Sequence, residues 1–364
     1  MGQRNRCCGA IQTDQDLLYK HAMLMVTLIA APLTGFATWA LARMVLEFLV
    51  ARDLMDRPNE RSSHSRPVPR GGGIAVMVMV LPSWLFLALM TGIFSQVWPI
   101  VLAAALLAMM SFADDVKGLS PLPRFAGHVA AVVLGLLLLP DSALLFDGWL
   151  PLWADRVIAG LAWVWFINLF NFMDGIDGIT GVETIAVAGG LAAALLVAVA
   201  GQGGDWSHAA LAAVLAGAGA GFLVLNWHPA RLFLGDVGSV PLGYLLGWLL
   251  LWVSCVAGLW WLVLLLPAYY WADATTTLVW RLLRGEKPWL AHRDHAYQAA
   301  IRAGTRHDHV ALLIAAVNGG LVASALAAMI GLVPVWSVLV FGALLTTLSL
   351  WYLRCRMGRQ NGSS

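Results

Sequence analysis

Charged residues are scarce in this sequence. Asp, Glu, Lys and Arg make up 12% of its 364 residues, whereas hydrophobic residues make up 60%. About a quarter of the residues of a soluble globular protein are charged, so this composition excludes an ordinary soluble domain. It indicates instead an integral protein of a lipid bilayer. The net charge of +2 is too small to indicate binding to a polyanion, and we expect no nucleic-acid partner.

The sequence also lacks an informative cysteine pattern, internal repeats and long polar segments. Its four cysteines, at positions 7, 8, 255 and 355, have neither the spacing of a metal site nor that of a disulfide framework. No segment repeats, and none has a biased composition. We therefore expect one membrane domain over residues 22–353, with a polar tail at 1–21 and a cytoplasmic tail at 354–364.

Long apolar runs predict an all-α, polytopic protein. Runs near the length of a membrane-spanning helix indicate about eleven spans. The first run is too long for the core of a signal peptide, so we expect it to be kept as a span. The predicted spans are 22–50, 73–94, 97–113, 124–140, 155–171, 182–200, 206–225, 239–256, 258–282, 308–331 and 335–353.

The basic residues predict the orientation of these spans. Most arginines and lysines fall in or beside 51–72, 114–123, 226–238, 283–307 and the C-terminal tail. Loops that remain in the cytoplasm carry an excess of Lys and Arg. We therefore expect a periplasmic N-terminus and a cytoplasmic C-terminus. The opposite side keeps only Arg4, Arg6, Lys20 and Arg156.

The most polar stretch at the end of an apolar run is Asn168–Gly181. It carries Asn168, Asn171, Asp174 and Asp177 together with three glycines. Ionisable groups at the edge of a membrane span are costly, so they indicate a functional site. The spacing of three residues between Asn171, Asp174 and Asp177 predicts that these side chains converge, and glycines permit close approach to a ligand. A polar turn between two spans is the alternative.

A second acidic group lies at the end of another apolar run and consists of Asp114 and Asp115. Adjacent carboxylates resist ionising together unless a cation lies between them, so the pair indicates a divalent cation, a catalytic base, or both. The alternative is a helix end that carries two aspartates. Acidic residues at a helix C-terminus oppose the helix dipole, which makes a purely capping role unfavourable.

The first cytoplasmic loop ends in Arg70 followed by Gly71, Gly72 and Gly73, with His64 upstream. Free amides of a glycine-rich turn bind phosphate, and an arginine beside them adds a bidentate donor. The loop is therefore a candidate phosphate site. Its arginines alone are equally explained as a topology signal.

Two further polar groups face the same side. Asp236 lies between glycines, which free it from helical geometry, although the segment is also explained as a turn. His292 and His295 lie three residues apart, and we interpret them as a cationic pair that contacts phosphate. Too few other ligands surround them for a zinc site. Asp273 lies inside a predicted span and needs a partner or a water-filled cleft.

Together these motifs resemble the polyprenyl-phosphate N-acetylhexosamine-1-phosphate transferases. The resemblance covers residues 56–298 and rests on the double aspartate 114–115, the N-x-x-N-x-x-D-G-x-D-G block, the G-D-x-G-S block and the histidine loop, in that order. The sequence of the first loop, R-S-S-H and then P-R-G-G-G, is most similar to that of the family members that initiate O-antigen synthesis. His292 and His295 in place of three adjacent histidines, and Arg124 in place of a lysine, argue against the peptidoglycan substrate.

The resemblance implies transfer of a sugar-1-phosphate from a UDP-N-acetylhexosamine (GlcNAc, FucNAc or QuiNAc type) to undecaprenyl phosphate, with release of UMP. It places the active site on the cytoplasmic face of the bacterial inner membrane and is compatible with a homodimer. It implies Mg²⁺, or Mn²⁺ in its place. The implied catalytic residues are Asp114, Asp115, Asp174 and Asp177, and the implied substrate-binding residues are His64, Arg70, Gly71, Gly72, Arg124, Asn168, Asn171, His292 and His295.

Asp236 is the expected metal ligand, on geometry as well as resemblance, because Mg²⁺ takes only one or two carboxylates together with waters and phosphates. Which aspartate acts as base or nucleophile, and whether the transfer takes one step or two, stays open. Two other functions remain. A secondary transporter would carry carboxylates near the bilayer midplane in inverted repeats. A subunit of a polysaccharide assembly complex would not need five aspartates on one side.

Overall fold

The computed structural model describes residues 4–56, 66–118, 120–146, 148–202, 206–287 and 292–360, of which 4–23, 116–117, 200–202 and 356–360 are described by their backbone alone. The described chain is almost entirely helical. Its elements are α1 (Arg4–Ala51), β1 (Met55–Asp56), β2 (Val68–Pro69), α2 (Gly72–Thr91), α3 (Phe94–Lys117), α4 (Pro121–Leu137), α5 (Leu152–Phe172), α6 (Ile179–Gln202), α7 (Ser207–Asn226), α8 (Asp236–Cys255), α9 (Trp261–Leu265), α10 (Ala268–Leu283), α11 (Ala296–Arg302), α12 (His307–Met329) and α13 (Val335–Gln360).

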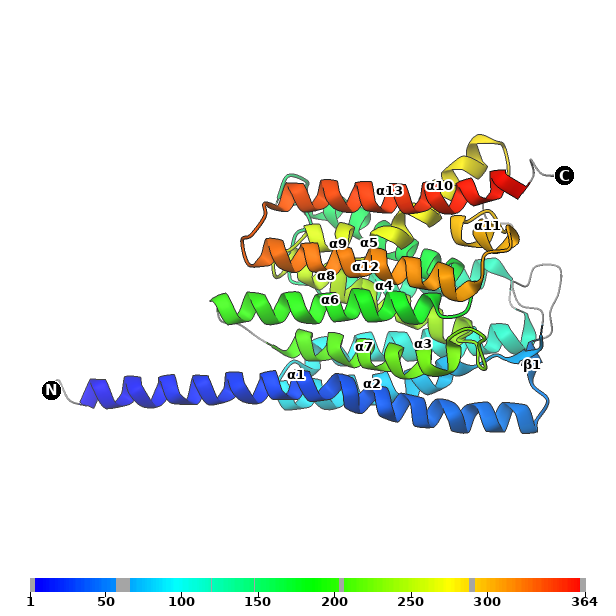
Figure 1. Cartoon of the computed structure of the whole chain (residues 1–364). Coiled ribbons are helices and arrows are strands. Elements are labelled where there is room, and N and C mark those ends of the chain that lie inside the picture. Colours follow the sequence, from blue (N-terminus) through cyan, green and yellow to red (C-terminus); the bar gives the residue numbers. More distant parts are fainter. Residues whose placement is uncertain are drawn as a thin grey trace.

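The long helices form one bundle of roughly parallel and antiparallel rods (Figure 1). Within the described residues, nine are long and apolar enough to cross a membrane. Large apolar side chains stay exposed on the outer helices, as lipid-facing surfaces require: Leu33 and Phe36 of α1 are 64% and 66% exposed. Tryptophans 149, 153 and 336 are exposed at the end of the bundle opposite α11, where interfacial aromatic residues are expected. The chain is thus a polytopic all-α membrane protein, as the sequence predicts.

Two of the eleven predicted spans differ from the helices found. The range 258–282 is divided into α9 and α10 at Pro267, because proline lacks an N–H and its ring clashes with the preceding helical turn. The range 124–140 corresponds to α4, which begins earlier, at Pro121, and has 17 residues. Proline is favoured in the first turn of a helix, where its missing N–H costs nothing. The remaining nine ranges match the nine candidate spans, and the total of eleven crossings stays a prediction.

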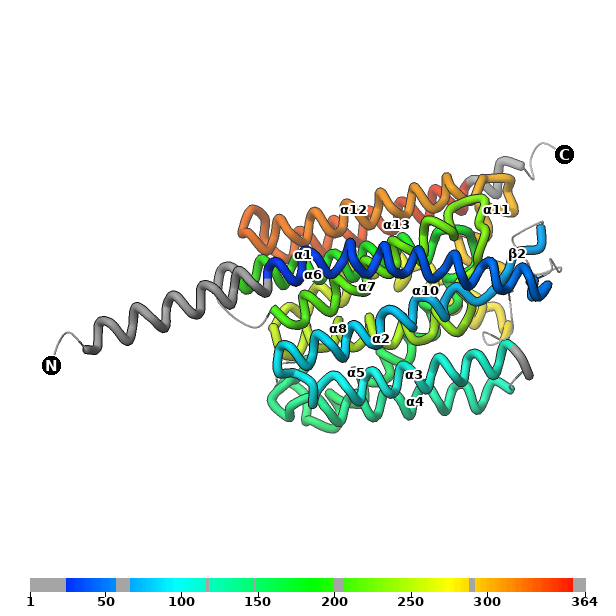
Figure 2. Tube along the Cα trace, turned by 90° about the horizontal axis from the view of Figure 1, so that it is seen from below, coloured from blue at the N-terminus to red at the C-terminus, as the bar shows by residue number. Residues whose placement is uncertain are grey.

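Close packing of glycines sets the positions of two helices that carry the polar motifs. A Cβ on Gly217 of α7 would lie 2.1 Å from the carbonyl oxygen of Ala31 in α1, so this contact admits only glycine. A Cβ on Gly73 of α2 would lie 2.3 Å from the amide nitrogen of Gly238 in α8. The first turns of α2 and α8 therefore touch through their backbones. Helix α8 lies at the centre of the bundle, with nearly all of its residues buried (Figure 2).

All the polar motifs lie at one end of the bundle, which we call the motif end. It contains the β1–β2 ribbon, α11, the starts of α4, α6, α8 and α12, and the last described residue of α13 (Figure 1). The start of α1 lies at the opposite end, so the two ends of the described chain are on opposite sides of the bundle (Figure 1). This arrangement agrees with the predicted opposite locations of the termini. Which side faces the cytoplasm stays a prediction.

We expect cysteine labelling in intact cells to place the motif end in the cytoplasm. In a background without Cys7, Cys8, Cys255 and Cys355, an exposed cysteine at His309 should resist a membrane-impermeant thiol reagent. One at Leu332, which is 72% exposed between α12 and α13 at the opposite end, should react. Reaction of the His309→Cys protein alone would reverse the orientation.

Candidate functional site

The centre of the motif end is Arg70, whose guanidinium lies between two carboxylates from different helices. Its Nη2 forms an ion pair with Oδ1 of Asp236, the first residue of α8, and lies 3.5 Å from Oδ1 of Asp115, near the end of α3. The side chain of Arg70 is 40% exposed, and those of Asp115 and Asp236 are 23% and 19% exposed. The three groups are thus accessible to a ligand from outside the bundle.

Backbone hydrogen bonds between the first loop and the segment before α8 fix Arg70 in this place. The amides of Gly71 and Gly72 donate to the carbonyl of Phe233 at 3.1 and 2.8 Å, and that of Gly73 donates to Leu234 at 2.9 Å. The expectation that Gly71 and Gly72 offer free amides to phosphate is therefore wrong. The glycines instead allow close packing, because a Cβ on Gly72 would lie 2.4 Å from the ring of Phe222.

A second ion pair lies beside the first. Arg124 of α4 donates from Nη1 to Oδ2 of Asp114 at 2.8 Å. The adjacent aspartates therefore have different partners: Asp114 pairs with Arg124, and Asp115 faces Arg70. Each carboxylate has a cation beside it, which reduces the electrostatic repulsion expected between two adjacent carboxylates.

The block between α5 and α6 does not converge as its spacing predicted. Helix α5 ends at Phe172, so Asp174 and Asp177 lie in a loop rather than on one helix face. Asn171 accepts a hydrogen bond from the Ser239 hydroxyl of α8 at 2.6 Å. Asp174 accepts from the Thr180 hydroxyl at 2.6 Å. Burial raises the pKa of Asp174 to about 6, against the opposing effects of Thr180 and Arg70.

Asn168 has its hydrogen-bond partners in α5 and α4. Its Nδ2 donates to the carbonyl of Val164 one turn back in α5 at 2.7 Å, and its side chain also hydrogen-bonds His128 of α4. Asn168 therefore joins α5 to α4 in the described structure. No contact of this side chain with the motif carboxylates is seen among the described residues.

Asp177 is held between two histidines from other elements. Its Oδ2 lies 2.6 Å from Nδ1 of His228 and accepts from the amide of Ala230 at 3.2 Å, and its Oδ1 lies 3.3 Å from Nδ1 of His307. Burial raises the pKa of the Asp177 carboxyl, but the hydrogen bonds from the histidines and the amide outweigh it and lower the pKa overall. His307 was not predicted, since nothing in the sequence links it to a residue 130 positions away.

Burial disfavours the charged form of both histidines of the histidine loop. Burial lowers the pKa of His292 to about 4, and it also lowers the pKa of His295. Burial therefore favours the neutral form of both rings, against the predicted cationic pair. A neutral imidazole can still donate a hydrogen bond to phosphate. The loop reaches the Asp174 segment through Tyr297, whose hydroxyl donates to the carbonyl of Phe172 at 3.0 Å.

Asp273 has a structural partner. It is fully buried and accepts from the amides of Ala296 and Tyr297 at 2.8 and 3.4 Å, so it caps the start of α11. It therefore does not act as an isolated midplane carboxylate of the kind that a transporter needs. The remaining predicted contact, His64, lies outside the described residues.

Two donor sets are candidates for a cation. Asp115 and Asp236 direct one oxygen each at the same Arg70 nitrogen, so a position between them already accommodates a positive group. Asp177, His228 and His307 also offer ligand atoms within 4.8 Å of one another. There, however, Nδ1 of His228 and Nδ1 of His307 already contact the Asp177 carboxylate at 2.6 and 3.3 Å, and two of the three groups offer nitrogen ligands, which suit a hard cation less well than oxygen. The Asp115 and Asp236 set fits a hard divalent cation with oxygen ligands better.

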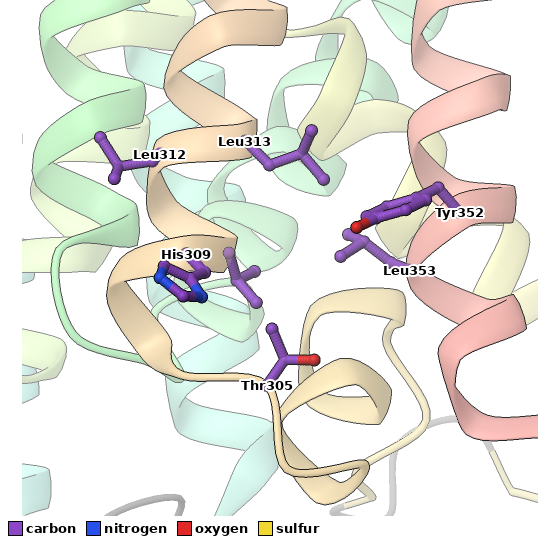
Figure 3. Close-up of a pocket in the computed structure, with 7 residues that line it drawn as sticks. Thr305, His309, Leu312, Leu313, Tyr352 and Leu353 are labelled. Carbon is purple, nitrogen blue, oxygen red and sulfur yellow. The ribbon is translucent and has the colours of Figure 1, made fainter. Parts of the chain in front are cut away.

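A separate pocket of about 490 Å³ lies between α12 and α13 (Figure 3). In Figure 3, Leu313 of α12 and Tyr352 of α13 extend toward each other across it. Its lining residues within the described chain include no carboxylate and are Thr305, His309, Val310, Leu312, Leu313, Tyr352 and Leu353. It is therefore not the site of charge-dependent chemistry.

Comparison with known proteins identifies the family. The family model described as glycosyl transferase family 4 matches residues 97–254, which include the double aspartate, the Asp174 block and Asp236. The phospho-N-acetylmuramoyl-pentapeptide-transferase of Francisella tularensis subsp. holarctica is 30% identical over 256 residues, covering 58% of this chain and 67% of that protein. This chain belongs to glycosyl transferase family 4.

Two other proteins are similar to this chain. The decaprenyl-phosphate N-acetylglucosaminephosphotransferase of Mycolicibacterium smegmatis is 33% identical over 250 residues, covering 62% of this chain and 58% of that protein. A protein of Bacillus subtilis named as a probable undecaprenyl-phosphate N-acetylglucosaminyl 1-phosphate transferase is 25% identical over 229 residues, covering 60% of this chain and 61% of that protein. The chain thus matches about three fifths of the length of these relatives.

Proposed function

We propose that this chain transfers an N-acetylhexosamine-1-phosphate from a UDP-sugar to undecaprenyl phosphate and releases UMP. The observation that carries the proposal is the pairing of two arginines with three aspartates at one end of an apolar bundle: Arg70 with Asp115 and Asp236, and Arg124 with Asp114. A lipid-linked phosphate and a nucleotide diphosphate both bring negative charge to such a place. The names of the related proteins describe transfers of this kind to polyprenyl phosphates.

The exchange needs charge neutralisation and alignment more than covalent chemistry. An oxygen of the lipid phosphate forms a bond to the sugar-linked phosphorus of the donor, the bond from that phosphorus to the UMP oxygen breaks, and UMP leaves with the electron pair. Arginines neutralise phosphate oxygens through bidentate hydrogen bonds. A Mg²⁺ held by Asp115 and Asp236 would polarise the diphosphate. We assign Asp114 and Arg124 to the lipid phosphate, because they form the neighbouring ion pair.

The donor sugar and the pathway belong to the proposal. We propose a donor of the UDP-GlcNAc, UDP-FucNAc or UDP-QuiNAc type and a role in starting O-antigen or another surface polysaccharide on the cytoplasmic face. The first-loop sequence supports the O-antigen subgroup. Two of the relatives described above are named for acetylglucosamine transfer, which supports UDP-GlcNAc as the first donor to test.

Release of UMP by the purified chain tests this function. The protein in detergent would be given undecaprenyl phosphate, Mg²⁺ and each UDP-sugar in turn, with a reaction lacking the lipid as control. We expect UMP and a lipid-linked product from at least one UDP-N-acetylhexosamine, and reversal when UMP and the product are supplied. A folded protein that releases no UMP with any donor of this class would contradict the proposal.

We expect Arg70→Lys to lower UMP release by about tenfold to a hundredfold, even though the charge is kept. A lysine presents a single point charge and cannot make two parallel hydrogen bonds to a phosphate or bridge two carboxylates with a planar group. The measurement is kcat/KM for the UDP-sugar. Arg43→Lys, at an exposed i,i+4 ion pair in α1, is the matched control and should behave as the unchanged protein. Unchanged kinetics in Arg70→Ala would reduce the first loop to a topology signal.

A further inference from the structure

Glu183 is a carboxyl group in the interior of the bundle that the proposed chemistry does not use. It lies four residues after the start of α6, about 6 Å along the helix, and is 0% exposed. Its Oε2 accepts a hydrogen bond from Nδ2 of Asn318 in α12 at 2.7 Å. Among the described residues it forms no ion pair. An ionised carboxylate in such a place is strongly unfavourable.

The polar side-chain atoms of Glu183 and Asn318 that do not take part in this hydrogen bond are both oxygens. Oε1 of Glu183 and Oδ1 of Asn318 are buried and have no hydrogen-bond partner in the part of the chain that the structure describes. A carboxylate oxygen and an amide carbonyl oxygen can only accept, so neither can satisfy the other while Glu183 is ionised. A proton on Glu183 removes the conflict, because the carboxylic O–H can donate to the amide carbonyl. A protonated Glu183 therefore carries the donor that the unpaired carbonyl oxygen of the same partner residue needs.

We infer that Glu183 is a neutral carboxylic acid that pairs with Asn318, and that this pair is a positioning contact which holds α6 against α12 beneath the loop of Asp174 and Asp177. Helix α6 begins directly after that loop, and Thr180 in its first turn donates to Asp174. Helix α12 begins with His307, which contacts Asp177. Helix α12 therefore contacts the loop that leads into α6 at the motif end and α6 itself inside the bundle.

This second contact fixes how far α6 can slide or rotate relative to α12. A shift of α6 would move Asp177 away from His307 and would move Thr180 away from Asp174. Misplacement of reacting groups by about 1 Å is enough to cost about a hundredfold in rate. The pair thus acts on the reaction through the loop and does not itself touch a substrate.

Infrared spectroscopy tests the neutral state directly. A protonated carboxyl gives a carbonyl stretching band separate from those of carboxylates. The spectrum of the purified protein in alkaline buffer, minus that of Glu183→Gln, should contain one such band, and ¹³C-labelling of glutamate should shift it. Absence of the band would overturn the inference. This measurement does not depend on the proposed function, whereas the rate measurements that follow rest on it.

Paired substitutions test the positioning role. Glu183→Gln keeps the shape and can still exchange two hydrogen bonds with Asn318, so UMP release should stay within about twofold. Asn318→Leu leaves the carboxyl of Glu183 without a partner, and UMP release should fall by about a hundredfold. The matched control is Thr346→Val in α13, which replaces a buried hydroxyl that has no hydrogen-bond partner among the described residues with a methyl group and should leave UMP release unchanged.

The results with these variants test the neutral state of Glu183 and the positioning role of the pair separately. Loss of UMP release in Glu183→Gln, with the protein still folded, would show that the negative charge is needed and would overturn the neutral pair. Wild-type UMP release in Asn318→Leu would overturn the positioning role. If the unchanged protein releases no UMP at all, the proposed function fails, and the infrared band alone decides the neutral pair.

Discussion

Asp236→Asn is expected to lower UMP release by about a thousandfold or more while the protein stays folded. Asp236 is the first residue of α8 and follows Gly235, whose φ of 75° is readily adopted only by glycine. Its carboxylate shares the Arg70 nitrogen with Asp115. Asparagine keeps the size of the side chain but removes the charge. A metal that polarises a phosphoryl group is worth several kcal/mol, so losing it corresponds to about three orders of magnitude in rate.

Binding of Mn²⁺ in place of Mg²⁺ tests whether Asp236 is a metal ligand. Because Mn²⁺ is paramagnetic, its binding can be measured without turnover of the substrates. We expect the unchanged protein to bind Mn²⁺ and Asp236→Asn to bind it much more weakly. Asp308→Asn is the matched control: it also lies at the motif end and is paired with an arginine, but it has no contact with Arg70 among the described residues. Equal Mn²⁺ binding by Asp236→Asn and the unchanged protein would transfer the ligand role to another carboxylate.

The helical bundle and the gathering of the motifs at one end could be predicted from the sequence. Apolar runs have a length set by the bilayer, so their number and alternation already place Asp114, Asp174 and Asp236 on one side. The structure confirms this through ion pairs that join distant segments, such as Arg70 with Asp236. The same reasoning failed for the predicted span 258–282. Its apolar run is continuous, but Pro267 ends one helix and the next begins directly after it.

The individual contacts of the site could not be predicted, because each depends on packing between distant helices. The glycines after Arg70 look like a phosphate-binding turn, yet their amides are used by Phe233 and Leu234. Asp177 is held by His307, which follows it by 130 residues. The charge of His292 depends on its burial, and burial is not a property of the local sequence. Spacing alone therefore identifies the residues but not their partners.

Substitution of either residue of the double aspartate is the second change for which we expect a large effect on UMP release. Asp114→Asn and Asp115→Asn should each lower UMP release by about a hundredfold or more, the scale of a lost general base, but for different reasons. Asp115 faces Arg70 and Asp236, so its loss should weaken Mn²⁺ binding. Asp114 is paired with Arg124 instead, so its loss should leave Mn²⁺ binding unchanged and act on the use of undecaprenyl phosphate.

A double-mutant cycle with Arg124 separates these roles. If Asp114 and Arg124 act together on the lipid phosphate, Asp114→Asn and Arg124→Gln should be strongly non-additive, because either change breaks the same ion pair. Asp115→Asn combined with Arg124→Gln should be closer to additive, since no contact joins these two side chains among the described residues. The assay is UMP release against undecaprenyl phosphate concentration at saturating UDP-sugar. Near-normal release by a folded protein that carries both Asp114→Asn and Asp115→Asn would remove the pair from the mechanism.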